Sequence, residues 1–99
     1  MTELLVKMTD INTIFQYEKN AKKHPAKQVD EIAKSILEFG FNVPILVDTS
    51  NVIASGCGRY LAAKKLNILN VPVVMLSGLT DGQIKKFRLA DNKVAESKW

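Results

Sequence analysis

The spacing of apolar residues predicts an alternation of short strands and helices along this chain. Leu4, Val6 and Met8 alternate with other residues near the start, and this alternation predicts a first strand. A helix is predicted from Pro25, a residue favoured at the first helical position, to Gly40, a residue typical of helix ends. Apolar residues recur between them every three or four positions, so one face of this helix is expected to lie in the core.

The middle of the chain predicts a β-hairpin followed by a second helix. Residues 43–47 and 52–54 are apolar runs rich in β-branched side chains, and the polar residues 48–51 between them favour a turn. The pattern then changes to helical spacing over residues 58–67, with inward positions at Tyr60 and nearby apolar residues.

The last third of the chain predicts one more strand and a third helix. Residues 71–76 are apolar, and residues 80–83, Thr-Asp-Gly-Gln, form a capping box. The helix that follows is expected to end at about Asp91 or Asn92. The resulting order, β-α-β-β-α-β-α, indicates a small α+β or α/β domain with a mixed sheet.

Length and composition are those of a single soluble domain. The 99 residues suffice for one thin core, and the hydrophobic fraction of 46% and charged fraction of 24% are ordinary. We therefore expect residues 1–99 to form one domain. The abrupt end on a large aromatic residue, Trp99, suggests a piece of a longer protein.

Charge and cysteine content narrow the function classes. The net charge of +4 suits phosphate or nucleic-acid partners, although surplus lysine also occurs on plain soluble domains. One cysteine excludes an internal disulfide, and one cysteine with one histidine makes no usual metal cluster. The sequence has neither the apolar core of a signal peptide nor a run of membrane-spanning length, so a cytoplasmic location is expected.

The most informative segment is the glycine turn Ser55-Gly56-Cys57-Gly58-Arg59, between a predicted strand and a predicted helix. Such a turn leaves backbone N–H groups at the positive end of a helix dipole, where phosphate binds well. Glycine allows close approach of a ligand, and an arginine adds a fixed positive charge.

Cys57 has two interpretations within this turn. A helix N-terminus and a neighbouring Arg59 would favour the thiolate form, which makes Cys57 a candidate nucleophile. The other interpretation is a small turn residue without chemistry of its own.

Three segments taken in order resemble the ParB/sulfiredoxin superfamily. They are N-A-K-K-H-P-A-K-Q-V-D-E-I-A-K-S-I-L-E-F-G, I-A-S-G-C-G-R-Y-L-A-A-K-K-L and L-T-D-G-Q-I-K-K-F-R-L-A-D-N-K-V-A-E. The resemblance covers roughly residues 5–99 and is strongest to ParB-like domains of phages or those associated with DNA methyltransferases. It implies a ParB/sulfiredoxin-like α+β fold with about four strands and three helices.

The resemblance also implies a binding site for the phosphates of CTP or ATP. The turn from Ser55 to Tyr60 falls on the family's triphosphate-binding turn, where Gly56 and Arg59 match the pattern and Cys57 and Gly58 depart from it. Sulfiredoxins carry their catalytic cysteine at the position of Cys57. The basic segment is expected to approach the phosphates through Asn20, Lys22 and Lys23.

Asp91 and Asn92 fall where the resemblance implies a contact with Mg²⁺ and nucleotide. A carboxylate and an amide oxygen are suitable ligands for this hard cation. The alternative is that Asn92 caps the end of the last helix.

Three functions follow from the residues and the resemblance. The leading hypothesis is a nucleotide-binding domain of a DNA-associated protein, either partition-like or a regulatory module of a DNA methylase. The second is a sulfiredoxin-like or kinase-like phosphotransfer enzyme that uses Cys57. The third is a non-specific DNA-binding or nuclease module whose lysines would contact phosphates: Lys19, Lys22, Lys23, Lys64 and Lys65.

The expected partners are a nucleotide and, through the parent protein, DNA, with no membrane. Homodimer formation is left open. Enzymatic activity is also left open, because hydrolysis of a nucleotide or of DNA needs a general base and the sequence offers no clear one.

Overall fold

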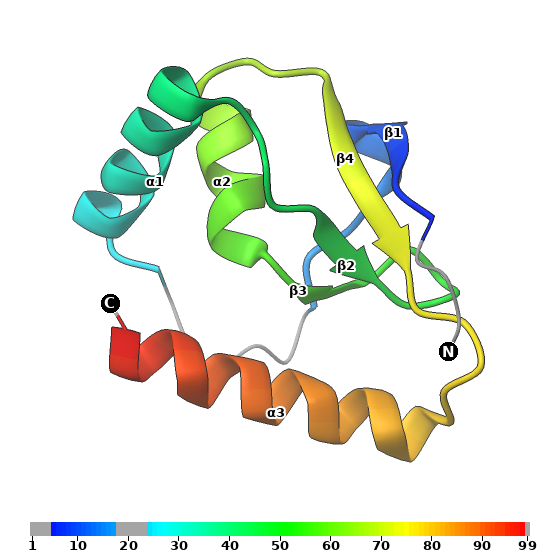
Figure 1. Ribbon diagram of the computed structural model, residues 1–99. Coiled ribbons are helices and arrows are strands. Elements are labelled where there is room, and N and C mark those ends of the chain that lie inside the picture. The colour runs from blue at the N-terminus through cyan, green and yellow to red at the C-terminus, as the bar shows by residue number, and fades with distance from the viewer. Residues whose placement is uncertain (1–4, 18–23, 99) are drawn as a thin grey trace.

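The structure is a computed structural model that describes residues 5–17 and 24–98, with side chains in the last helix up to Leu89. Its elements, shown in Figure 1, are β1 (Lys7–Asp10), a 3₁₀ turn η1 (Ile11–Thr13), α1 (Ala26–Phe39), β2 (Ile45–Val47), β3 (Ile53–Ser55), α2 (Cys57–Lys65), β4 (Asn70–Met75) and α3 (Asp81–Lys98). The predicted order of strands and helices is therefore confirmed.

The four strands form one mixed sheet in the order β1-β4-β2-β3. β4 pairs antiparallel with β1 and parallel with β2, and β2 and β3 form the predicted antiparallel hairpin. The Asp48 carboxylate holds the hairpin turn by accepting hydrogen bonds from the N–H groups of Ser50 (2.8 Å) and Val52 (3.0 Å). This is the turn chemistry for which aspartate is favoured.

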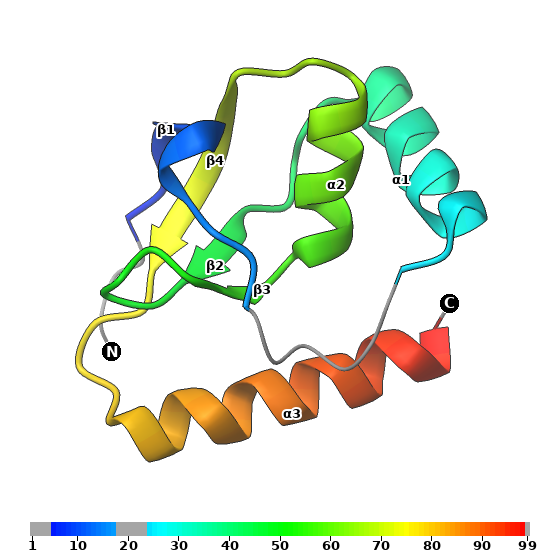
Figure 2. The same ribbon diagram turned by 180° about the vertical axis from the view of Figure 1, so that it is seen from behind.

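The helices α2 and α1 lie as successive layers on one side of the sheet (Figure 1; Figure 2 shows the same layers from behind). Two buried clusters join these layers. Tyr60 and Ala63 of α2 face the sheet residues, while Ala62 faces Val29 and Ile32 of α1. The helix α2 is thus covered on both sides, and its position is fixed by the sheet and by α1.

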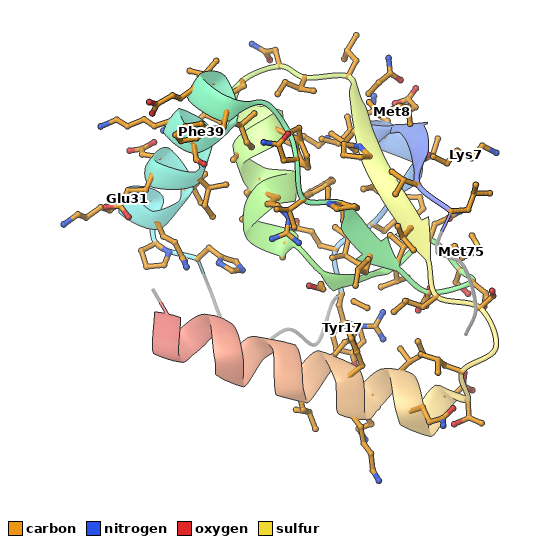
Figure 3. The ribbon with its side chains drawn as sticks, in the orientation of Figure 1. Lys7, Met8, Tyr17, Glu31, Phe39 and Met75 are labelled. Atoms are coloured by element: carbon orange, nitrogen blue, oxygen red, sulfur yellow. The ribbon has the colours of Figure 1, made fainter. Side chains whose placement is uncertain are left out.

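The N-terminal strand differs from the sequence pattern in what it buries. β1 begins at Lys7, and Met8 is 62% exposed at the edge of the sheet (Figure 3). The core contacts come instead from Ile11 and Ile14, both 2% exposed, in and after the 3₁₀ turn. Leu4 lies outside the described residues.

The last helix is longer than predicted. Its capping box forms as expected, because Gln83 N–H donates to Thr80 Oγ1 (3.1 Å) and Thr80 N–H donates to Gln83 Oε1 (2.8 Å). The helix does not end at Asp91 or Asn92, however, and continues to Lys98. The interpretation of Asn92 as a C-terminal cap is therefore wrong, because its backbone lies inside α3.

The two helices α1 and α2 meet at Gly58. A Cβ atom at this position would lie 2.8 Å from Ile32 Cδ1 and 3.5 Å from His24 Nδ1. No real side chain tolerates the shorter of these distances without a shift, so glycine at position 58 is what lets the helices pack this closely.

We expect Gly58→Ala to lower the free energy of unfolding by about 1 kcal/mol, because overpacking outweighs the helix-propensity gain of alanine. The matched control is Gly82→Ala in α3, where the nearest atom to a new Cβ is Thr80 Oγ1 at 3.9 Å. That variant should gain about 0.5–1 kcal/mol. Urea unfolding measures both, and stabilisation by both substitutions would contradict the packing role of Gly58.

Candidate phosphate-binding turn

Gly56 makes the transition from β3 to α2 within a single residue. It has φ 99° and ψ 22°, a left-handed conformation that costs other residues energy. A Cβ at this position would lie 3.3 Å from Ile45 Cα, in the backbone of the neighbouring strand, and 2.9 Å from Arg59 Nη2. Both the conformation and the space at position 56 therefore require glycine.

The first turn of α2 presents backbone N–H groups at the positive end of the helix. The first helical hydrogen bond runs from Tyr60 N–H to Gly56 O at 2.9 Å. The N–H groups of Cys57 and Gly58 come before this bond and have no partner within the helix, and Gly56 has no side chain that could cap them. This is the arrangement that binds an anion.

Arg59 places its charge beside the turn. Its Nη2 donates a hydrogen bond to Pro44 O at 3.1 Å and lies close to Gly56. The side chain is thereby bound along the chain that enters β2. The positive charge is fixed next to Gly56, where it adds to the potential of the helix N-terminus.

Cys57 lies in the turn, but its surroundings do not favour the thiolate. Burial raises the pKa of the Cys57 thiol, and the hydrogen bond that Gln16 Nε2 donates to Sγ at 3.3 Å opposes this only in part. The expectation that the helix terminus and Arg59 would make Cys57 a thiolate is therefore wrong, since the loss of hydration is the larger effect.

The other predicted site residues have different outcomes. Ser55 ends β3 beside the turn, and Gly58 is buried beneath it. Tyr60 is only 9% exposed and belongs to the core, so it stabilises the turn from inside and its ring is not available to a ligand. Asn20, Lys22 and Lys23 lie outside the described residues, and Asp91 and Asn92 are described only as backbone of α3.

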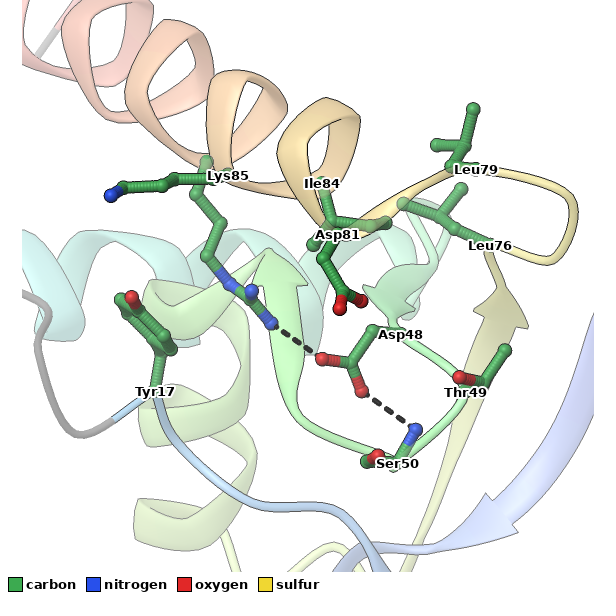
Figure 4. Close-up of a pocket in the computed structure, with 10 residues that line it drawn as sticks. Tyr17, Asp48, Thr49, Ser50, Leu76, Leu79, Asp81, Ile84 and Lys85 are labelled. Atoms are coloured by element: carbon green, nitrogen blue, oxygen red, sulfur yellow. Dashed lines mark hydrogen bonds and ion pairs between the residues drawn. The ribbon is translucent and has the colours of Figure 1, made fainter.

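A second polar cluster, centred on Arg88, attaches α3 to the hairpin. The Arg88 side chain donates to Ile53 O (3.1 Å), Val52 O (3.2 Å) and Asp48 Oδ2 (3.0 Å). Its guanidinium also lies over the ring of Tyr17, 4.3 Å from the centroid (Figure 4). The sequence pattern marks Arg88 only as a polar helix position, so nothing in it predicts this role.

The Arg88 cluster borders an open pocket of about 320 Å³ between the hairpin turn and the start of α3 (Figure 4). The pocket is lined by Tyr17, Asp48, Thr49, Ser50, Leu76, Leu79, Asp81, Ile84, Lys85 and Arg88. It includes none of the residues of the turn at 55–59. The chemistry predicted for the turn therefore does not extend to this pocket.

Asp48 is ionised more readily than an ordinary aspartate. Burial alone would raise the pKa of Asp48, but hydrogen bonds from Val52, Arg88 and Ser50, together with the Arg88 charge, lower it below its usual value. The pair is well shielded, with side-chain exposures of 21% for Asp48 and 11% for Arg88.

The described parts of the chain lack two further features. No helix there is long and apolar enough to cross a membrane. Within the same residues, no three His, Cys, Asp or Glu side chains lie together as a metal site would require. The Mg²⁺ prediction rests on Asp91 and Asn92, whose side chains lie outside the described part of the structure.

Comparison with known proteins gives a family match over nearly the whole chain. Residues 2–93 match the ParB N-terminal domain. The chain is 45% identical over 67 residues to the ParB-like nuclease domain-containing protein YnaK of Escherichia coli, across 77% of that protein. It is 33% identical over 72 residues to the probable chromosome-partitioning protein ParB of Rickettsia typhi, but spans only 25% of it.

Solved structures share the fold at low sequence identity. The chromosome-partitioning protein ParB from Caulobacter crescentus, complexed with CTP-gamma-S, matches with a TM-score of 0.75 at 20% identity, over 88% of this chain and 52% of that one. Sulfiredoxin from Arabidopsis thaliana matches with a TM-score of 0.69 at 23% identity, over 84% of this chain and 96% of that one. These matches confirm the predicted ParB/sulfiredoxin-like fold.

The attachment of α3 through Asp48 predicts a specific loss of stability in acid. The lowered pKa means that ionised Asp48 stabilises the fold at pH values above its unfolded-state pKa, near 3.8. This contribution is lost as the pH falls through the lower folded-state pKa of Asp48. At neutral pH, Asp48→Asn should reduce the free energy of unfolding by roughly 1–3 kcal/mol.

The control for this experiment is Asp30→Asn, which removes an exposed ion pair with Lys65 whose side chains are 48% and 54% exposed. It should cost less than about 1 kcal/mol. Urea unfolding at pH 7 and pH 3 measures all three proteins. Equal losses from the two substitutions at pH 7 would contradict the special role of Asp48.

The burial of Cys57 predicts slow alkylation. At pH 7.5 the folded chain should react with iodoacetamide more slowly than free cysteine does, because less of the thiol is ionised and access to Sγ is reduced. The urea-unfolded chain is the control and should react at the rate of free cysteine. A folded-state rate above that of free cysteine would restore Cys57 as a candidate nucleophile.

Proposed function

We propose, from the premise that this chain belongs to the ParB N-terminal domain family, that it binds the phosphates of a nucleoside triphosphate, CTP or ATP, on the turn at residues 55–59. In this proposal it serves as the nucleotide-responsive module of a DNA-associated protein. That protein would be partition-like or associated with a DNA methylase, and DNA would be contacted through its other parts.

The observation that carries the proposal is the left-handed Gly56 at the start of α2. This residue turns the chain so that the amides of Cys57 and Gly58 stand at the helix N-terminus without a capping side chain. Arg59 holds its charge against the same turn. A triphosphate is the ligand that matches several N–H donors beside a fixed positive charge.

The related fold supports this choice of ligand. The ParB structure from Caulobacter crescentus was solved with CTP-gamma-S, and its fold matches 88% of this chain. The ligand belongs to that protein, and the transfer to this chain is part of the proposal. CTP is therefore the first nucleotide to test, with ATP as the second.

The two alternative functions receive less support from the residues. A phosphotransfer enzyme using Cys57 would need a reactive thiolate, whereas burial raises the pKa of the Cys57 thiol. A DNA surface on α2 would need available lysines. Lys65 is paired with Asp30. Lys64, near the end of α2 that is remote from the turn, contacts Asn12 Oδ1 and the Tyr60 ring.

Calorimetric titration with CTP and ATP, with and without Mg²⁺, tests the proposal. The wild-type chain should bind at least one of them, and Arg59→Ala should weaken binding by roughly 1–3 kcal/mol through loss of a charge-assisted contact. Thermal unfolding of the variant must be checked alongside, because Arg59 also donates to Pro44 O.

The matched control is Lys64→Ala, which removes one positive charge from the same helix but from an exposed position near its other end. It should bind nucleotide as the wild type does. No binding by the wild-type chain at millimolar nucleotide would contradict the proposal, and equal losses from the two substitutions would remove Arg59 from the site.

A further inference from the structure

His24, at the entrance to α1, is held by a buried amide. Its Nδ1 lies 3.0 Å from Gln28 Oε1, one helical turn further on. Gln28 is 8% exposed and is the one polar side chain that is buried among the described residues. Because a buried amide needs a hydrogen-bond partner, this contact fixes the orientation of the imidazole ring.

The same ring lies against the phosphate-binding turn. A Cβ at Gly58 would be 3.5 Å from His24 Nδ1 and 3.6 Å from His24 Cε1, which is ordinary contact distance. Ile32 thus occupies the space that a side chain at position 58 would need, and the His24 ring borders that space. The imidazole of a residue just before α1 is thereby brought beside Gly58, in the first turn of α2.

The described part of the chain gives the ring no acidic partner. Its one hydrogen bond there is the contact of Nδ1 with Gln28, and the ring is partly exposed. Asp30 of α1 is paired with Lys65 of α2. The remaining charged or titratable groups on α1 and the start of α2 are the exposed Lys27, Glu31, Lys34 and Glu38, and the Cys57 and Arg59 groups described above.

We infer that His24 is a phosphate-binding residue of the turn at 55–59, and that nucleotide binds more tightly when the imidazole is protonated. Gln28 Oε1 is an acceptor and so holds the proton on Nδ1. In the neutral ring Nε2 is then itself an acceptor and repels a phosphate oxygen, whereas in the charged ring both nitrogens donate. The inference rests on the proposed function and adds a regulation by pH to it.

The chemistry requires no covalent step. Phosphate binding takes up one proton on His24 Nε2, and the imidazolium and the phosphate then satisfy each other as a charge-assisted pair. Such a pair is lost when the imidazole loses its charge.

The test is calorimetry with CTP and with ATP at pH 6 and pH 8, on the wild type, on His24→Gln and on Lys27→Gln. The terminal phosphate of the nucleotide also titrates near pH 6 and affects all three proteins alike. Between pH 6 and pH 8 the affinity of the wild type should fall about tenfold more than the affinity of His24→Gln. This difference is the scale of one charge-assisted hydrogen bond. Lys27→Gln, an exposed change on the same helix, should keep the wild-type pH dependence.

An independent measurement uses the wild type alone. The chain has one histidine, so its imidazole NMR signal needs no assignment. At pH 7 the addition of CTP or ATP should move this signal towards its protonated position. This arm decides the question even where His24→Gln does not fold.

The outcomes separate the two proposals. Binding with the same pH dependence in the wild type and in His24→Gln, or an imidazole signal that nucleotide leaves unchanged, overturns the role of His24 while the turn remains a nucleotide site. An absence of binding at either pH overturns the proposed function and this inference together.

Discussion

At Gly56 the chain passes from the edge strand β3 into the helix α2 within one residue, and the rest of the structure is arranged around that reversal. The left-handed conformation directs α2 back across the sheet, so that Tyr60 and Ala63 enter the core. The missing side chain lets Ile45 of β2 approach from one side and the Arg59 guanidinium from the other. The backbone that packs the core and the backbone that could bind an anion are therefore the same few residues.

The other elements reach this turn through a small number of contacts. α1 is brought to it at Gly58, where Ile32 takes the space of an absent side chain and the His24 ring lies at contact distance. α3 is attached through Arg88 to the carbonyls of the hairpin that leads into the turn, and Tyr17 lies on the same guanidinium (Figure 4). These hydrogen bonds join α3 directly to the strand that leads into the turn.

The sequence predicted the elements well because each has strong local signals. Gly40 ends α1, the Thr80–Gln83 box starts α3, and the polar residues 48–51 form the hairpin turn. The predicted end of α3 at Asp91 or Asn92 was wrong, because the prediction gave a short polar motif more weight than helix propensity. No residue near Asn92 breaks a helix, and α3 continues to Lys98. The first strand was predicted from Leu4, Val6 and Met8 but begins at Lys7, and the buried residues Ile11 and Ile14 lie in and after the 3₁₀ turn, where periodicity gives no signal.

The candidate site was only partly predictable for a related reason. Gly56 and Arg59 belong to one short segment, so the sequence alone identified them. Gln16, His24 and Arg88 act across 34 or more positions, since Gln16 contacts Cys57, His24 contacts Gly58 and Arg88 contacts Val52 and Ile53. The effect of burial on the Cys57 thiol likewise depends on packing that no local pattern records.

The measurement that tests the central claim most directly is a map of backbone amide NMR shifts as CTP is added to the labelled chain. Phosphates on the Gly56 turn should give the largest changes at the amides of residues 56–59, with smaller changes where α1 meets them. Changes concentrated instead at the pocket residues 48–50 and 85–88, or no changes at saturating CTP, would contradict the claim that this glycine turn is a phosphate-binding site.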